Sequence, residues 1–84
     1  MKLLIVDDEE LTRSGLFSSI DWPSLGIRTV LQADDGFNGL VLAKKEKPDI
    51  ILCDVRMPRL TGIQMLEQLE PLLPETVFIF MSGY

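Results

Sequence analysis

The chain has 84 residues and a formal net charge of −5, which allows one small domain. The acidic balance argues against direct nucleic-acid binding, because phosphates are bound by clustered Lys and Arg. With no histidine and a single cysteine, Cys53, the chain offers no conventional zinc site and no internal disulfide. No apolar run is long enough to cross a bilayer and no signal peptide is apparent, so we expect no membrane contact and a cytoplasmic location.

The first half of the chain predicts a strand, a helix and a second strand. Residues 3–6 are an apolar run of the kind that forms a buried parallel strand, and we predict a strand over residues 2–6. A helix is predicted over residues 9–20, with Asp8 as its N-cap. The apolar face expected for this helix comprises Leu11, Leu16, Phe17 and Ile20. Pro23 ends the segment, and residues 27–33 are predicted to form the second strand.

The second half repeats this alternation. Residues 34–36 are predicted to form a turn and a helix cap, and a helix is predicted over 37–46, whose apolar positions include Leu40, Val41 and Ala43. Further along the chain we predict a strand at residues 50–54, a helix at 63–69 and a strand at 76–81. The loop after Asp54 carries Arg56 and Arg59, which we expect to be solvated. Alternation of strands and helices at this spacing predicts a parallel sheet with right-handed crossovers.

Acidic residues end two of these strands. Asp7 and Asp8 follow the first apolar run, and Asp54 ends the run at 50–54. Because the carboxyl ends of parallel strands share one edge, where open α/β folds bind ligands, we expect the three side chains to converge. Clustered carboxylates repel one another unless a shared proton or a hard cation relieves them. The pattern favours Mg²⁺, although Asp7-Asp8 taken alone is more typical of a helix cap.

Four features occur in a specific order: the acid pair after the first strand, the Asp ending the third, Met57-Pro58 before Gly62, and Ser82-Gly83 after the fourth. Together they resemble the receiver domain of two-component response regulators, from end to end of the chain. The matching stretches are residues 4–9, 33–36, 48–58 and 80–84. Residues 20–27 and the final Ser82-Gly83-Tyr84 resemble the subgroup with an AraC-type DNA-binding output domain.

This resemblance implies a fold and a site. The fold is a flavodoxin-like (CheY-like) doubly wound parallel sheet of order 2-1-3-4, with residues 1–84 forming one receiver domain. Asp54 accepts a phosphoryl group from a sensor histidine kinase. Asp8, Asp54 and the backbone carbonyl of Arg56 bind Mg²⁺, and Asp7 reaches it through water. The Ser82 hydroxyl bonds a phosphoryl oxygen, and Gly83 leaves room for the donor.

The implied function is a phosphorylation-dependent switch, not an enzyme, that acts on transcription through a DNA-binding domain outside this sequence. One alternative is a small Mg²⁺-dependent phosphatase with Asp54 as nucleophile. Such enzymes place a general acid two residues later, where this chain has Arg56, and arginine cannot donate a proton at neutral pH. Another alternative is a structural unit that only associates with itself.

The sequence departs from the family at its end. A receiver has a fifth strand followed by a Lys that pairs with the phosphoryl group, whereas this sequence stops after the predicted fourth strand, as if C-terminally truncated. We therefore expect the fourth strand to be an exposed edge and the apolar faces of the strands to lose cover. A homo-oligomer would bury Leu4, Val6, Phe78 or Phe80 between copies.

Overall fold

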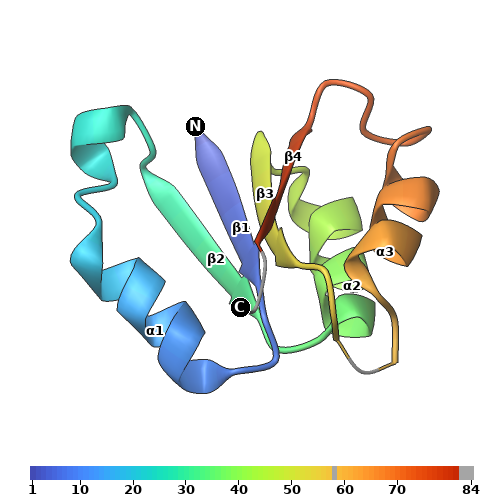
Figure 1. Cartoon of the computed structure of the whole chain (residues 1–84). Helices are drawn as coiled ribbons and strands as arrows, with labels where there is room; N and C mark the ends of the chain where they lie inside the picture. Colours follow the sequence, from blue (N-terminus) through green and yellow to red (C-terminus); the bar gives the residue numbers. More distant parts are fainter. Residues whose placement is uncertain (58, 82–84) are drawn as a thin grey trace.

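The four strands form one parallel sheet of order β2-β1-β3-β4 (Figure 1). The computed structural model describes residues 1–57 and 59–81. The strands are β1 (Lys2–Val6), β2 (Thr29–Ala33), β3 (Ile50–Asp54) and β4 (Val77–Met81). The predicted order 2-1-3-4 is confirmed, and with it the convergence of all carboxyl ends on one edge.

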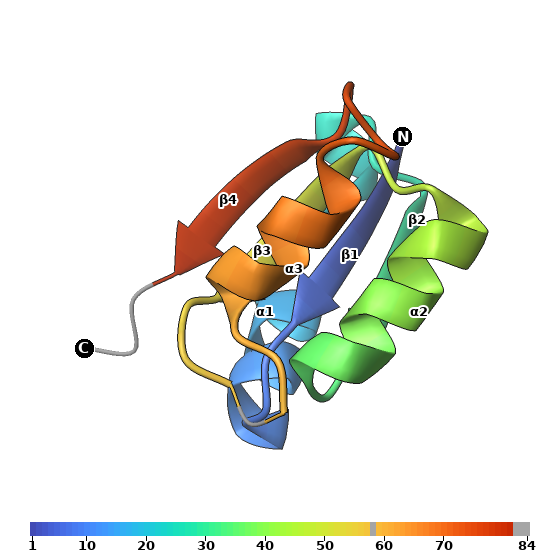
Figure 2. The same cartoon turned by 90° about the vertical axis from the view of Figure 1, so that its right-hand side faces the viewer.

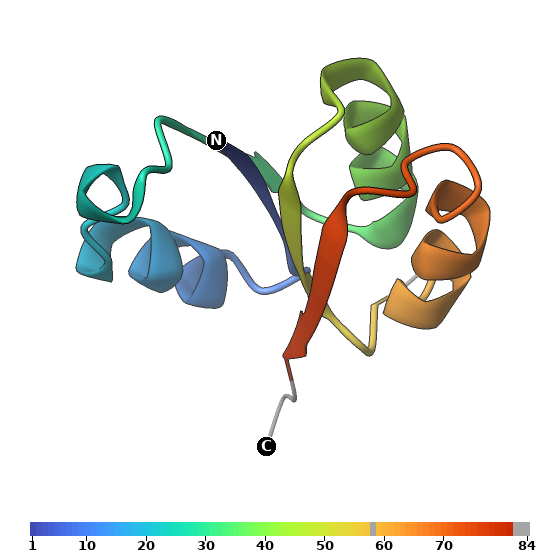
Figure 3. The same ribbon diagram turned by 90° about the horizontal axis from the view of Figure 1, so that it is seen from above.

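The helices cover both faces of the sheet unequally. They are α1 (Glu10–Ser19), α2 (Gly36–Glu46) and α3 (Gly62–Leu69), with a short 3₁₀ turn, η1 (Pro23–Leu25), after α1. Figure 3 shows α1 and η1 on one face and α2 with α3 on the other. In the described part of the chain, no helix is both long and apolar enough to pass through a bilayer.

Alternation along β1 divides the interior into two clusters. Leu4 and Val6 face α2 and α3, while Leu3 and Ile5 face α1, and all four are at most 2% exposed. The first cluster also contains Ala33, Leu40, Ala43, Ile51, Cys53, Met57, Met65 and Leu69. The second contains Trp22 and Ile27, with Leu16 and Ile20 of the α1 segment packed against it. Both faces of β1 are therefore covered within a single chain.

Two expectations about helix α1 are wrong. Asp8 is not its N-cap: Glu9 occupies that position and makes no side-chain cap bond. Leu11 is 87% exposed and Phe17 is 46% exposed, so the buried stripe of α1 reduces to Leu16 and Ile20. Val41 of α2 is likewise exposed, although we predicted it at an apolar position. Leu11 lies about half a turn around α1 from Ile20, so the two side chains cannot share one face.

Element boundaries shift where turn chemistry intervenes. The second strand begins at Thr29, not at residue 27, because η1 and Gly26 redirect the chain before it. Gly26 has φ of 80°, and the Ile27 N–H donates to the Trp22 carbonyl at 3.0 Å. Trp22 is buried, and its indole N–H donates to the Phe17 carbonyl. The remaining predicted boundaries differ by one residue or not at all.

Strand β4 is an edge of the sheet, as predicted (Figure 2). Val77 and Ile79 are 55% and 45% exposed, whereas Phe78 and Phe80 pack on the α2–α3 side. The expectation that Leu4 and Val6 await cover from another copy is wrong, because α2 and α3 already bury them completely.

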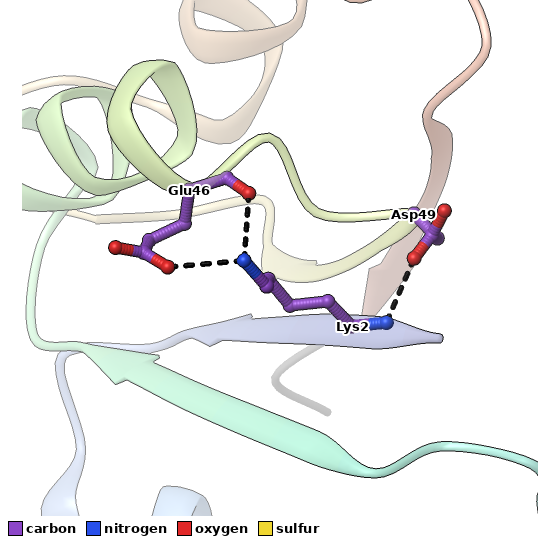
Figure 4. A network of polar contacts seen from close by, with 3 residues as sticks. All are labelled: Lys2, Glu46 and Asp49. Carbon is purple, nitrogen blue, oxygen red and sulfur yellow. Dashed lines mark hydrogen bonds and ion pairs between the residues drawn. The ribbon is translucent and has the colours of Figure 1, made fainter.

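The amino-terminal end of the sheet is tied by Lys2 (Figure 4). Its ammonium group donates to the Glu46 carbonyl and carboxylate, both at 3.1 Å, at the end of α2. Its backbone N–H donates to Asp49 at 2.7 Å. Lys2 therefore pairs with groups at the amino-terminal end of the strands, whereas the acidic residues lie at the carboxyl end.

Candidate functional site

Three carboxylates meet at the carboxyl edge of the central strands. Asp7 and Asp8 follow β1 directly, and Asp54 is the last residue of β3. The pairing of Val6 with Cys53 sets the two strand ends side by side. One oxygen from each carboxylate lies within 4.8 Å of the other two. The predicted convergence of Asp7, Asp8 and Asp54 is therefore present in the fold.

The three acids differ in their surroundings. Asp7 is 3% exposed and Asp54 is 8% exposed, while Asp8 is open to solvent. Asp7 is held on both sides: its Oδ1 accepts the Glu9 N–H at 2.9 Å, and its carbonyl accepts from the Arg13 guanidinium at 3.0 Å. The site therefore has two buried carboxylates, each accepting a backbone N–H, beside one carboxylate that solvent reaches.

Asp54 is fixed by the loop that follows it. The backbone N–H of Arg56 donates to Asp54 Oδ1 at 3.1 Å. This hydrogen bond sets the orientation of the carboxyl group and brings Arg56 to the site, although through its N–H. The ligand role that the resemblance implies for the Arg56 carbonyl stays a prediction. Arg56 is an exposed residue.

The electrostatics of the cluster favour a cation. Burial raises the pKa of Asp7, the Glu9 N–H lowers it, and the charges of Asp54 and Asp8 raise it further. A positive ion beside the three carboxylates would relieve both burial and repulsion. Oxygen-only ligands at this spacing suit a hard divalent cation such as Mg²⁺. The residues present therefore fit the metal that the sequence suggested.

Cys53 takes no part in this chemistry. Burial raises the pKa of its thiol to about 12, and the charges of Asp54 and Asp7 act in the same direction. The thiol donates to the Asp54 carbonyl at 3.2 Å and lies 4.0 Å from the Met65 sulfur. It is a buried core residue and not a thiolate ligand.

Two further expectations concern the chain end at Ser82 and Gly83 and the loop residue Arg59. Ser82 and Gly83, predicted to contact the phosphoryl group and its donor, lie outside the described residues, and their roles stay predictions. Arg59 is exposed, as expected, and it also forms an ion pair with Asp35 at 3.0 Å. Sequence reasoning assigned Asp35 only a turn and a cap. The cap is confirmed, but nothing in the local pattern indicated the partner.

The chain matches the family model of the response regulator receiver domain over residues 3–84. It is 34% identical over 83 residues to the transcriptional regulatory protein HptR of Staphylococcus aureus strain NCTC 8325, covering 99% of this chain and 32% of that protein. The chain therefore spans about a third of the length of this curated relative.

Solved structures agree with the fold. A two-component transcriptional regulator AraC from Clostridium phytofermentans superposes with a TM-score of 0.93 at 48% identity, covering 100% of this chain and 68% of that one. A CheX–CheY–BeF3–Mg²⁺ complex from Borrelia burgdorferi gives a TM-score of 0.86 at 27% identity, covering 100% of this chain and 63% of that one.

Proposed function

Since the chain belongs to the response regulator receiver domain family, we propose that it is a phosphorylation-dependent switch in which Asp54 accepts a phosphoryl group from a sensor histidine kinase. The observation that carries the proposal is the meeting of Asp54 with Asp7 and Asp8 at the carboxyl edge. Residues 1–84 would form one receiver unit of a cytoplasmic protein. Control of transcription through an AraC-type output domain is supported by the description of the Clostridium neighbour.

Mg²⁺ is the cation that we propose for the cluster. Asp8, Asp54 and the Arg56 carbonyl would hold it, with Asp7 acting through water. The support is the spacing of the three carboxylates and the pKa of Asp7, together with the Borrelia neighbour, which is described as containing Mg²⁺ and BeF3. When bound, the cation would offset negative charge on the transferred phosphoryl group.

The residues then have simple tasks. A carboxylate is a weak nucleophile but needs no general base. One oxygen of Asp54 bonds to phosphorus while the phosphorus–nitrogen bond to the donor histidine breaks, and the bonding electrons remain on the imidazole nitrogen. The Arg56 N–H orients the Asp54 carboxyl group before the reaction. The Ser82 hydroxyl is proposed to donate to a phosphoryl oxygen.

Two other functions are distinguishable from the switch. A Mg²⁺-dependent phosphatase would use the same nucleophile but needs a general acid, and the position two residues after Asp54 is Arg56. A purely structural, self-associating unit would use the exposed apolar residues Val77 and Ile79 of β4 and no acid chemistry. Self-association is compatible with the switch. Sedimentation at several protein concentrations tests self-association, and a monomer at every concentration would rule it out.

Incubation of the intact protein with acetyl phosphate and Mg²⁺, followed by intact mass measurement, tests the proposal. We expect a stable mass gain of one phosphoryl group. Rapid multiple turnover of acetyl phosphate without an accumulating adduct would favour the phosphatase. Absence of both, in a protein shown to be folded, would leave only the structural unit.

A further inference from the structure

The loop between β3 and α3 is attached to the molecule at three places. At its base, the Gly62 N–H donates to the Val55 carbonyl at 3.2 Å. Near Asp54, the Arg56 N–H donates to the carboxylate. On its far side the loop reaches the start of α2, as Figure 2 shows, through Arg59 and Leu60. The third attachment involves no residue of the proposed metal site.

Arg59 carries this third attachment. Its Nη1 donates to Asp35 Oδ2 at 3.0 Å, and its guanidinium carbon lies 4.6 Å from the centre of the Phe37 ring. Asp35 also caps α2, since its Oδ1 accepts the Asn38 N–H at 2.7 Å. The Asp35 carboxylate therefore accepts one hydrogen bond from the start of α2 and one from Arg59, so this single side chain joins the loop to the helix.

The backbone supports the same contact. Arg59 has φ of 71°, a left-handed conformation that a side-chain-bearing residue adopts only where its surroundings favour it. Immediately after it, the Leu60 carbonyl packs against Gly36, where a Cβ would collide with it. Arg59 and Leu60 therefore contact Asp35, Gly36 and Phe37, three consecutive residues at the start of α2.

We propose that Arg59 is a positioning residue whose ion pair with Asp35 holds the loop so that Arg56 stays on Asp54, and that it couples the acidic site to the start of α2. The proposal rests on the proposed function, because its consequence is expressed in Mg²⁺ affinity. Releasing Arg59 frees the far side of the loop and loosens the Arg56–Asp54 hydrogen bond. Because coupling is reciprocal, Mg²⁺ binding must in turn alter the start of α2.

The sign of the effect separates positioning from simple charge. Arg59→Gln removes a positive charge, which by itself should strengthen cation binding to an acidic site. Positioning predicts the opposite. Arg28→Gln is the matched control, because Arg28 is an exposed arginine just before β2, at the other end of the sheet. Asp35→Asn removes the ion pair and keeps the cap, since Asn is as good an N-cap as Asp.

The experiment is a Mg²⁺ titration of the intact protein followed by amide NMR, with melting temperatures measured for every variant. Exposed ion pairs contribute little free energy, so losing one changes a binding constant only a few-fold. We therefore expect Arg59→Gln to weaken Mg²⁺ binding about 2- to 5-fold. Arg28→Gln should leave the Mg²⁺ affinity unchanged or slightly higher. The double variant Arg59→Gln/Asp35→Asn should bind no more weakly than the weaker single variant. Mg²⁺ should shift the Phe37 and Asn38 amides in the native protein and not in Arg59→Gln.

A metal-free readout keeps the two proposals distinguishable. The Arg56 amide should exchange its hydrogen faster in both Arg59→Gln and Asp35→Asn than in Arg28→Gln. Unchanged Mg²⁺ affinity and unchanged Arg56 exchange in Arg59→Gln would overturn the positioning role while leaving the switch intact. A lower melting temperature alone would assign Arg59 a structural role only. If the native protein bound no Mg²⁺, the proposed function would fail. If the Arg56 amide still exchanged faster in Arg59→Gln and Asp35→Asn, Arg59 would nevertheless hold the loop, but with no effect on metal binding.

Discussion

The Leu60 carbonyl oxygen occupies the space that a Cβ of residue 36 would need, so Gly36 and Leu60 meet backbone to backbone. This contact joins the start of α2 to the loop that follows Asp54. A side chain at position 36 would have to displace main-chain atoms, which cannot rotate away as a flexible side chain can.

Gly36→Ala should therefore destabilise the protein by about 1–3 kcal/mol, the usual cost of overpacking. Chemical denaturation measures the change. Gly15→Ala in α1 is the control: nothing lies within 4 Å of its added Cβ, so alanine should stabilise the protein by about 0.5–1 kcal/mol through helix propensity. Equal stability of Gly36→Ala and the native protein would show that the loop does not rest on Gly36.

Asp8→Ala should abolish Mg²⁺ binding or weaken it by at least about 10-fold, the scale found even for groups that only support metal ligands. Titration calorimetry checks this. Glu10→Gln removes the same charge from the exposed first turn of α1 and should change the affinity only slightly. Unchanged affinity in Asp8→Ala would contradict the assignment of the site.

Stability should depend on pH through Asp7. Its pKa in the folded protein is raised above the ordinary value of 3.8, chiefly by burial. The folded state therefore holds this proton more tightly than the unfolded state, and the group's contribution to stability is lost as pH rises through the folded pKa. Without divalent cations, Asp7→Asn should melt at a higher temperature than the native protein near neutral pH.

The same variant should show a weaker pH dependence of melting as the pH rises above 3.8, the ordinary pKa of the carboxyl group. The Asn Oδ1 can still accept the Glu9 N–H, so the backbone bond that fixes residue 7 is retained. Added Mg²⁺ should stabilise the native protein more than Asp7→Asn. A lower melting temperature for Asp7→Asn at neutral pH in chelator would refute the electrostatic account.

Thr61→Ala should cost about 1 kcal/mol, because it removes the capping box of α3. Thr61 Oγ1 accepts the Gln64 N–H at 3.2 Å, and Gln64 Oε1 accepts the Thr61 N–H at 2.9 Å. Thr12→Ala, on the exposed surface of α1, should be neutral or mildly stabilising. Thermal melts of the two variants provide the comparison, and equal effects would show that the cap is dispensable.

The strands and the acid cluster were predictable because their signals are local and topological. β1 and β3 are apolar runs that end in acids, and a parallel sheet brings such ends together whatever the loops do. The face of α1 was assigned wrongly, because Leu11 lies about half a turn around the helix from Ile20, which packs against the core. Only tertiary packing shows that Leu16 and Ile20 alone are covered.

The contact between Arg59 and Asp35 was equally inaccessible. It joins residues 24 positions apart through a left-handed backbone at an arginine, and no propensity indicates that conformation. The sequence around Asp35 predicts only the N-cap of α2 and gives no indication that its carboxylate also pairs with Arg59. The side chains that could be placed from sequence are those whose position follows from strand order; those that depend on loop conformation needed the structure.

The central claim is that Asp54 is the phosphoryl acceptor, and peptide mass mapping of the intact protein after acetyl phosphate and Mg²⁺ treatment tests it most directly. The account predicts one phosphoryl group, located on the peptide containing Asp54, lost in Asp54→Asn and retained in Asp34→Asn, which removes an exposed acid of the turn before α2. Phosphorylation of Asp54→Asn to the native extent, or a phosphoryl group mapped to another acid in the native protein, would contradict it.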